Sequence, residues 1–304
     1  MIHVVSLMKG IVMNLLVDGS SLLFRAHFIN KARGQQSVKD DIYIFLNSLK
    51  SYVKMFDTDN IYIAWDKRLD YPCTNFREEA TKGDYKGQRD KEAAKDVFEC
   101  EEKLNEITTS LGCKNIYPKT LEGDDVIAWL ADTLDGQNII VTTDSDMLQL
   151  VNEKNSIYKP RKKKLIDLVN FKEEVGIEPE YFLTYKAILG DKSDNIPGVT
   201  GYGKVKAKEL ARTYSSTDVD VDIKTLIESN IKLMDLRKGY VIANESECYK
   251  SQLMELNNIE TDIDAFKEYC QEYNYGSFLK RFNEWESLFR GSRLLSILNN
   301  LSFE

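Results

Sequence analysis

Four short apolar runs, rich in β-branched and aromatic residues, are typical of buried β-strands and cover residues 12–17, 61–65, 114–117 and 138–142. Between them, apolar residues recur every three or four positions, which predicts helices, most clearly over the segments 42–55 and 125–133. Strands that alternate with helices favour parallel pairing. We therefore predict an α/β fold, doubly wound around a mostly parallel central sheet.

The pattern changes beyond about residue 167, where helical spacing with short turns continues to the C-terminus. We predict an α/β core over residues 1–166 and a mostly helical region over residues 167–304. The apolar opening of the chain is followed by Lys9 and lacks the cleavage site of a signal peptide. We interpret it as a short extension of a core that begins near Met13.

The connection over residues 71–105 is polar, charged and long for a link between two strands. We expect much of it to be helical, with so thin an apolar stripe that it projects from the core. Connections of this length tend to be functional or disordered.

Composition narrows the class of protein only a little. The 304 residues suffice for one large α/β domain with an appendage, and no stretch is long enough to span a membrane. The five cysteines contain no CxxC pair, which favours a reduced cytoplasmic setting. The net charge of −8 does not exclude nucleic acid, because basic residues cluster at 82–95, 159–164 and 204–212.

Acidic residues stand where the predicted strands end. Asp18 ends the first strand, Asp66 ends the second, and a later strand runs into Asp144 and Asp146. In doubly wound sheets, ligands bind beyond the carboxyl ends of the strands, so these side chains share one edge. Further acids open or close predicted helices: Glu122, Asp124, Asp125, Asp191 and Asp194.

Such a set of acids suits Mg²⁺, which prefers carboxylate oxygens and acts in pairs on phosphodiesters. A single aspartate after a strand is more often a helix cap or a turn former. Gathered at one edge, unpaired carboxylates ~4 Å apart repel by roughly 4 kcal/mol at an effective dielectric of 20, so such a cluster is costly unless cations bind. Nine carboxylates exceed the charge of two Mg²⁺ ions, so several must hold metal-bound waters or share protons.

The motifs that carry these acids resemble those of the 5′ nuclease family: flap endonucleases, bacteriophage 5′-exonucleases and the 5′ nuclease domain of bacterial DNA polymerase I. The likeness covers about residues 14–212. It includes V-D-G-S-S at 17–21, E-G-D-D at 122–125 (with Gly in place of the usual Ala), T-D-S-D at 143–146 and G-D-K-S-D-N-I-P-G-V at 190–199. Chance is a poor explanation for all of them in this order.

By position, the resemblance implies two Mg²⁺ ions, for which Mn²⁺ can substitute. The tighter catalytic site would use Asp18, Asp66, Glu122, Asp124 and Asp125. The second site would use Asp144, Asp146, Asp191 and Asp194. All the acidic positions expected of an active member are present.

The resemblance also assigns the 71–105 connection to the family's helical arch, through or beneath which a 5′ single strand passes. Lys86 and Arg89 would stabilise the scissile phosphate in the transition state. Arg77 and Tyr85 would add phosphate contact and base stacking. For any single lysine here, a solvated charged helix is the alternative explanation.

Residues 185–213 resemble the family's helix–hairpin–helix element, which grips the DNA duplex and often binds a monovalent cation, typically K⁺. Its glycines let the backbone approach a phosphate, and its lysines add charge. The DNA-binding residues implied are Gly198, Gly201, Gly203, Lys204, Lys206 and Lys208. The basic run at 159–164 lies on a predicted surface hairpin, and we interpret it as a solvated face.

The resemblance implies a Mg²⁺-dependent 5′→3′ exonuclease and structure-specific 5′ flap endonuclease, acting on DNA with a 5′ flap or 5′ end and on RNA–DNA hybrids. We expect a free-standing monomer without a polymerase module, because the chain ends at Glu304, in the cytoplasm of a bacterium or a phage-infected host. Two alternatives stay open: a non-catalytic DNA-junction-binding protein of the same fold, and a PIN-type ribonuclease, which would lack the arch and the hairpin element.

Overall fold

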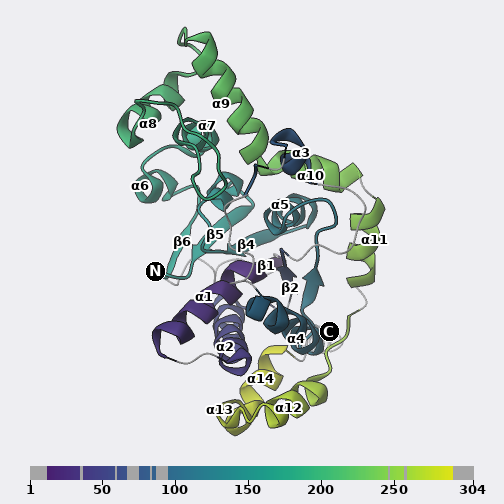
Figure 1. The fold of residues 1–304 in the computed structure, drawn as a ribbon. Helices are drawn as coiled ribbons and strands as arrows, with labels where there is room; N and C mark the ends of the chain where they lie inside the picture. Colours follow the sequence, from purple (N-terminus) through teal and green to yellow (C-terminus); the bar gives the residue numbers. More distant parts are fainter. Residues whose placement is uncertain are drawn as a thin grey trace, which may run out of the picture.

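The computed structural model describes residues 12–34, 37–58, 60–66, 75–82, 84–86, 95–245, 247–256 and 259–289. A six-stranded sheet in the order β3-β2-β1-β4-β5-β6 lies at its centre, parallel except for the β5–β6 pair (Figure 1). The strands are β1 (Met13–Asp18), β2 (Asn60–Ala64), β3 (Lys114–Ile116), β4 (Gln137–Val141), β5 (Asn155–Lys159) and β6 (Lys164–Ile166). The predicted mostly parallel α/β sheet is confirmed.

Helices cover both faces of the sheet, as the double winding requires. On one face, Leu15 and Val17 pack against α1 (Gly19–Ala32), α2 (Val38–Phe56) and α4 (Lys95–Ser110). On the other, Leu16 packs against α5 (Gly123–Thr133), which is in turn covered by α10 (Leu236–Glu245) (Figure 1). The strands are buried on both sides, which is why their sequences are apolar runs with little alternation.

Helix α4 belongs to the core, so the prediction that the 71–105 connection projects is wrong for this part. Val97, Cys100, Leu104 and Ile107 are buried against the neighbouring helices. They recur every three or four residues, and the charged residues between them hide this continuous stripe in the sequence. The rest of the connection is described only as α3 (Phe76–Ala80), residues 81–82 and residues 84–86.

Beyond β6 the described elements are helical, as predicted. Besides α10, they are α6 (Phe171–Val175), α7 (Pro179–Leu189), α8 (Lys204–Thr213), α9 (Val221–Met234), α11 (Glu247–Leu256), α12 (Ile263–Glu272), α13 (Gly276–Lys280) and α14 (Phe282–Phe289). Helices α12, α13 and α14 gather beside α2 and α4, far from α7 to α9 (Figure 1). Within the described ranges, the structure holds no helix with the length and apolarity needed to span a membrane.

A ladder of four asparagines crosses the sheet near the amino ends of its strands. Asn60 donates to Asn14, Asn14 donates to Asn138 at 2.8 Å, and Asn138 donates to Asn155 at 2.7 Å. These residues are direct partners in the strand register. A shift of one residue in the strand register would break every one of these hydrogen bonds and leave polar groups unpaired. The ladder therefore fixes the register, and with it the relative positions of the carboxyl ends of the strands.

Candidate functional site

The carboxyl ends of β1 and β2 meet the first turn of α5. Asp18 caps α1, because its Oδ1 accepts from the Ser21 amide at 2.9 Å, while its Oδ2 accepts from Thr142 Oγ1 at 2.6 Å. Asp66 accepts from the amide of Gly123 at 3.1 Å. The strands and the helix approach so closely that a Cβ at Gly123 would lie 2.7 Å from Asp66 Oδ1.

The carboxylates at this edge disturb one another. Burial raises the pKa of Asp18 to about 7, and the charge of Asp66 contributes to the rise. Burial also raises the pKa of Asp124 well above its ordinary value, and the charges of Asp144, Asp18 and Asp66 add to this effect. The predicted convergence of these acids is thus present, and their mutual repulsion is what a divalent cation would relieve.

Glu122 faces the same edge and is held by residues of the 71–105 connection. Its carboxylate accepts from Lys86 Nζ at 2.7 Å and from the Tyr85 hydroxyl at 3.0 Å. Although burial acts against it, Lys86 and Arg77 hold the pKa of Glu122 below its ordinary value. Lys86 therefore lies beside the acids, as the sequence predicts, whereas Arg89 lies outside the described residues.

The hydroxyl of Tyr85 links the two predicted groups of acids. Besides Glu122, it lies 3.3 Å from Asp194 Oδ2, and the amide of Lys86 donates to the carbonyl of Asp194 at 3.4 Å. The side chain of Tyr85 is only 8% exposed. Its ring is therefore not available for the base stacking expected from the sequence. In this structure the hydroxyl of Tyr85 positions carboxylates instead.

Arg77 and Asp125 form a buried ion pair. Nη1 of Arg77 lies 2.6 Å from Asp125 Oδ2, Nη2 lies 2.7 Å from Oδ1, and Nε donates to the carbonyl of Leu233 at 2.7 Å. Both carboxylate oxygens are engaged, and Arg77 is 2% exposed. The roles expected from the sequence, metal binding for Asp125 and phosphate contact for Arg77, do not fit this geometry. The pair instead anchors α3 to α5, and the bond from Arg77 to Leu233 anchors α3 to the end of α9.

Two acids of the second group, Asp146 and Asp191, meet at a lysine. Lys186, on α7, lies 2.7 Å from Asp146 and 3.2 Å from Asp191. Asp144 accepts from the amide of Asp146 at 2.8 Å. Sequence reasoning missed Lys186, because its only signal is a place on the helix that leads into Asp191.

Lys186 partly balances the charges of the second group of acids. Burial raises the pKa of Asp146 even though Lys186 acts to lower it. Burial acts to raise the pKa of Asp191 too, but the Ser193 hydrogen bond and the charge of Lys186 bring it below its ordinary value. Lys186 therefore joins two acids that the sequence assigned to one metal site.

Lys159, at the end of β5, is a second lysine that the sequence did not single out. Its Nζ donates to the carbonyl of Asp144. Burial lowers the pKa of Lys159 to about 8, although Asp144 and Asp18 act to raise it. The basic run at 159–164 is therefore not a uniformly solvated face, because its first member is turned toward the acids.

The donor chemistry of this edge fits hard divalent cations, since its groups are carboxylates and two of them, Asp18 and Asp124, are destabilised as anions. As the side chains stand, no group of three or more His, Cys, Asp or Glu within the described ranges is arranged to hold a metal ion. Four of the acids contact other side chains instead: Glu122 contacts Lys86 and Tyr85, Asp194 contacts Tyr85, and Asp146 and Asp191 contact Lys186.

The loop between α7 and α8 is compact because of two glycines. A Cβ at Gly190, whose φ is +71°, would lie 2.4 Å from the Gly198 amide, and a Cβ at Gly198 would lie 2.1 Å from the Leu189 carbonyl. Asn230 of α9 ties the loop down by donating to the carbonyls of Ala187 and Pro197. Gly198 is therefore required for packing, and the sequence held no local signal for the role of Asn230.

Other members of the predicted DNA-binding set face outward. A Cβ at Gly201 or Gly203 would meet nothing within 4 Å, and Lys204 and Lys206 are exposed. Lys208 differs, because its Nζ lies 3.4 Å from the Val175 carbonyl and is turned onto α6.

Comparison with known proteins gives this geometry a context. The family described as 5′-3′ exonuclease, N-terminal resolvase-like domain, matches residues 13–176. A 5′-3′ exonuclease of Mycoplasmopsis pulmonis is 27% identical over 89% of this chain and 93% of its own length. A 5′-3′ exonuclease of Bacillus subtilis is 32% identical over 67% of this chain and 71% of its own length. In fold, the chain is similar to the T5 D15 protein, which was crystallised with metal ions: the TM-score is 0.67 at 22% identity, over 81% of this chain and 99% of that one.

Proposed function

Because this chain belongs to the 5′-3′ exonuclease family, we propose that it is a Mg²⁺-dependent 5′→3′ exonuclease and structure-specific 5′ flap endonuclease. Its substrates would be DNA with a 5′ end or a 5′ flap and the RNA–DNA hybrids of primers. We propose that it acts as a monomer in the cytoplasm. The observation that carries the proposal is the gathering of acids at the carboxyl ends of the strands, where burial, and after it the charges of neighbouring acids, raise the pKa of Asp18 and of Asp124.

Two groups of carboxylates would hold the ions. The first comprises Asp18, Asp66, Glu122 and Asp124, and the second comprises Asp144, Asp146, Asp191 and Asp194. When bound, Mg²⁺ (or Mn²⁺) ions activate a water and stabilise the leaving oxygen of an in-line displacement. The metal ions crystallised with the T5 D15 protein, which is similar in fold, support this assignment.

The cations among the acids would exchange partners when substrate arrives. Lys86 and Lys186 now neutralise Glu122, Asp146 and Asp191. With these carboxylates engaged as ligands, both ammonium groups would be free to meet phosphate oxygens, where negative charge develops during the reaction. Arg89, three positions beyond Lys86, would act beside it. Asp125 would serve the site indirectly by holding Arg77 in place.

We assign the duplex to the α7–α8 element as a helix–hairpin–helix over residues 185–213. The exposed backbone at Gly201 and Gly203 lets a phosphate approach the start of α8, with Lys204 and Lys206 nearby. K⁺ at this hairpin would add a further positive charge. Lys208 is omitted from this surface because it packs on α6.

The proposal is tested by incubating a 5′-labelled flap DNA with Mg²⁺ and either wild type, Asp146→Ala or Lys86→Ala. We expect no cleavage by Asp146→Ala with duplex binding retained, and cleavage slowed about 10²–10³-fold by Lys86→Ala. Asp264→Ala, an exposed acid on α12, is the matched control and should cut at the wild-type rate. Equal cleavage by all four proteins would refute the site.

The same assay tests one of the alternatives, a DNA-junction-binding protein without catalysis. Such a protein would bind the flap fully in EDTA and would show no Mg²⁺-dependent product. For a nuclease we expect cleavage that begins on addition of Mg²⁺ and stops on chelation.

A further inference from the structure

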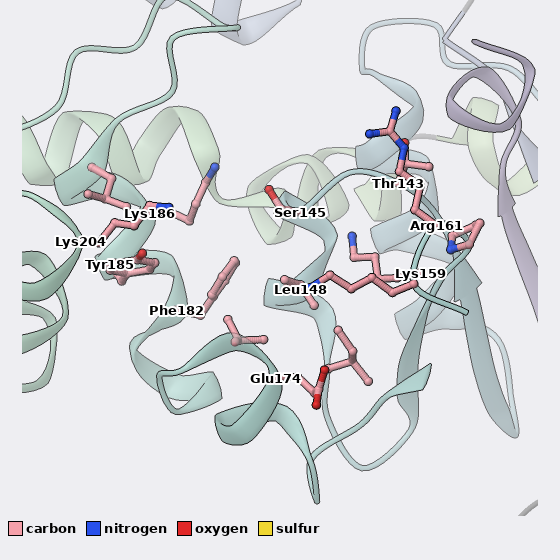
Figure 2. Close-up of a pocket in the computed structure, with 15 residues that line it drawn as sticks. Thr143, Ser145, Leu148, Lys159, Arg161, Glu174, Phe182, Tyr185, Lys186 and Lys204 are labelled. Atoms are coloured by element: carbon pink, nitrogen blue, oxygen red, sulfur yellow. The ribbon is translucent and has the colours of Figure 1, made fainter. Parts of the chain in front are cut away.

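A cavity of about 500 Å³ lies beside the second group of acids. The hairpin of β5 and β6 supplies Lys159 and Arg161 to one wall, and α7 supplies Phe182, Tyr185 and Lys186 to the opposite wall (Figure 2). Thr143 and Ser145, which flank Asp144, also line it. We call this cavity, between the β5–β6 hairpin and α7, the hairpin pocket.

The charged groups of the hairpin pocket are almost all cations. They are Lys159, Arg161, Lys162, Lys186 and Lys204. The carboxylate of Glu174 also lines it, but this group pairs with Lys164. Arg161, Lys162 and Lys204 are exposed and form no ion pair with any residue that the structure describes. These cations, which we call the rim of the pocket, therefore attract an anion, and the three without an ion pair can bind it directly.

Apolar side chains line the same cavity beneath this rim. Leu148, Phe182 and Leu189 belong to the core or pack against it, and each contributes to the lining. Cavities of roughly 300–1,000 Å³ hold small molecules, with apolar walls for the body of the ligand and a few polar groups for its orientation. A cationic rim above an apolar floor suits an anion that carries a flat, apolar body. A bare phosphate or sulfate would leave the floor uncovered.

We propose that the hairpin pocket binds a single 5′-phosphorylated nucleotide, with its phosphate at the lysines and arginine and its base over the apolar floor. This inference rests on the proposed function, since the pocket adjoins Asp144 and Asp146, where strands would be cut. Two sources supply this chemistry: a mononucleotide released by exonuclease action, and an unpaired nucleotide still joined to its strand.

Binding is tested by calorimetric titration of deoxyadenosine 5′-monophosphate into the full chain in EDTA, which removes any contribution from divalent metal. Lys162→Glu and Lys163→Glu form a matched pair: both change the charge of the same hairpin turn equally, but only Lys162 lines the pocket. We expect Lys162→Glu to weaken binding at least 10-fold, whereas Lys163→Glu stays within twofold of wild type. Equal weakening by both variants would overturn the proposal, because it would reveal only a diffuse charge effect.

Two further ligands test the chemistry of the pocket. Deoxyadenosine, which lacks the phosphate, and inorganic phosphate, which lacks the base, should each bind at least 10-fold more weakly than the mononucleotide. If inorganic phosphate binds as well as the mononucleotide, the apolar floor has no role and the nucleotide assignment fails. If none of the three ligands binds the wild type, the pocket assignment fails, while Mg²⁺-dependent flap cleavage remains a separate result.

The source of the nucleotide is decided by cleavage in the presence of Mg²⁺. If the pocket holds released product, added mononucleotide inhibits wild type and Lys163→Glu, and Lys162→Glu loses this inhibition. If it holds an unpaired nucleotide of the strand, Lys162→Glu raises the KM for flap DNA while leaving that for a fully paired 5′ end unchanged. A variant that shows neither behaviour contradicts the proposal.

Discussion

The guanidinium of Arg77 and the carboxylate of Asp125 meet in a two-pronged ion pair, at 2.6 and 2.7 Å, with both side chains buried. The pair lies next to Glu122, whose carboxylate is 3.7 Å from the same guanidinium. It also joins three segments that are far apart in sequence, since Arg77 donates to the carbonyl of Leu233. The geometry of the site thus depends on a contact made outside it.

Arg77→Ala should destabilise the protein strongly, because it leaves the carboxylate of Asp125 buried without its partner. Removing one member of a buried pair costs about 3–5 kcal/mol of unfolding free energy. Arg212→Ala is the control, since its pair with Glu178 is exposed and worth about 0–1 kcal/mol. Urea unfolding followed by circular dichroism measures both. A loss below 1 kcal/mol for Arg77→Ala would show that the pair does not anchor the fold.

Helix α10 approaches Asp125 so closely that a side chain at Gly239 has no room: its Cβ would lie 2.2 Å from Oδ1 and 2.6 Å from Cβ of Asp125. Gly239→Ala should therefore cost about 1–3 kcal/mol by overpacking and should also reduce nuclease activity, because Asp125 must move. Gly276→Ala, in another helix, has open space around it and should stabilise by about 0.5–1 kcal/mol. Thermal unfolding of the two variants gives opposite signs if this packing is correct.

The Tyr85 hydroxyl contacts the carboxylates of acids from both predicted metal sites, Glu122 at 3.0 Å and Asp194 at 3.3 Å. Tyr85→Phe keeps the buried ring but loses these hydrogen bonds, each worth about 1.5–3 kcal/mol to a charged group. We expect kcat to fall by about 10-fold or more, with little change in DNA binding. Tyr43→Phe, which loses a hydroxyl contact to Ser277 far from the site, should leave kcat unchanged.

Much of the sheet could be predicted from the sequence because its parallel strands are buried on both faces and are therefore apolar runs. The acids that end them could be placed at one edge for the same reason, as Asp18 and Asp66 confirm. Strands β5 and β6, which lie outside the four apolar runs, and helix α4 were harder. Strand β6 is only three residues long, and in α4 charged residues stand between the apolar ones along the sequence.

The parts of the site that the sequence did not reveal depend on tertiary contacts. Lys186 is an ordinary helical lysine until α7 packs against η2 (Asp146–Leu150) and brings it to Asp146. In the sequence Asp125 looks like a metal ligand, but in the fold it pairs with Arg77, which is 48 residues away along the chain. Single-sequence reasoning places residue types along elements, but it does not determine which partner each charge meets.

The carboxylate of Asp124 costs free energy in the metal-free protein, because burial and its acidic neighbours raise its pKa. An acid whose pKa is raised by folding destabilises the folded state once the pH exceeds its ordinary value, and this cost is relieved as the pH falls. Asp124→Asn should therefore abolish cleavage and yet stabilise the protein in EDTA by about 1–2 kcal/mol, a gain that is larger at pH 8 than at pH 4. Asp132→Asn, an exposed acid of the same helix, should change stability little.

Titration with Mg²⁺ completes this test. Because the ions would neutralise the repelling acids, Mg²⁺ should raise the Tm of the wild type and of Asp132→Asn in a concentration-dependent manner. Asp124→Asn begins from a higher Tm in EDTA and should gain less, since one source of repulsion and one ligand are both gone. If Asp124→Asn is less stable than wild type in EDTA at pH 8, the acids do not repel one another, and the electrostatic reason for placing cations at this edge is lost.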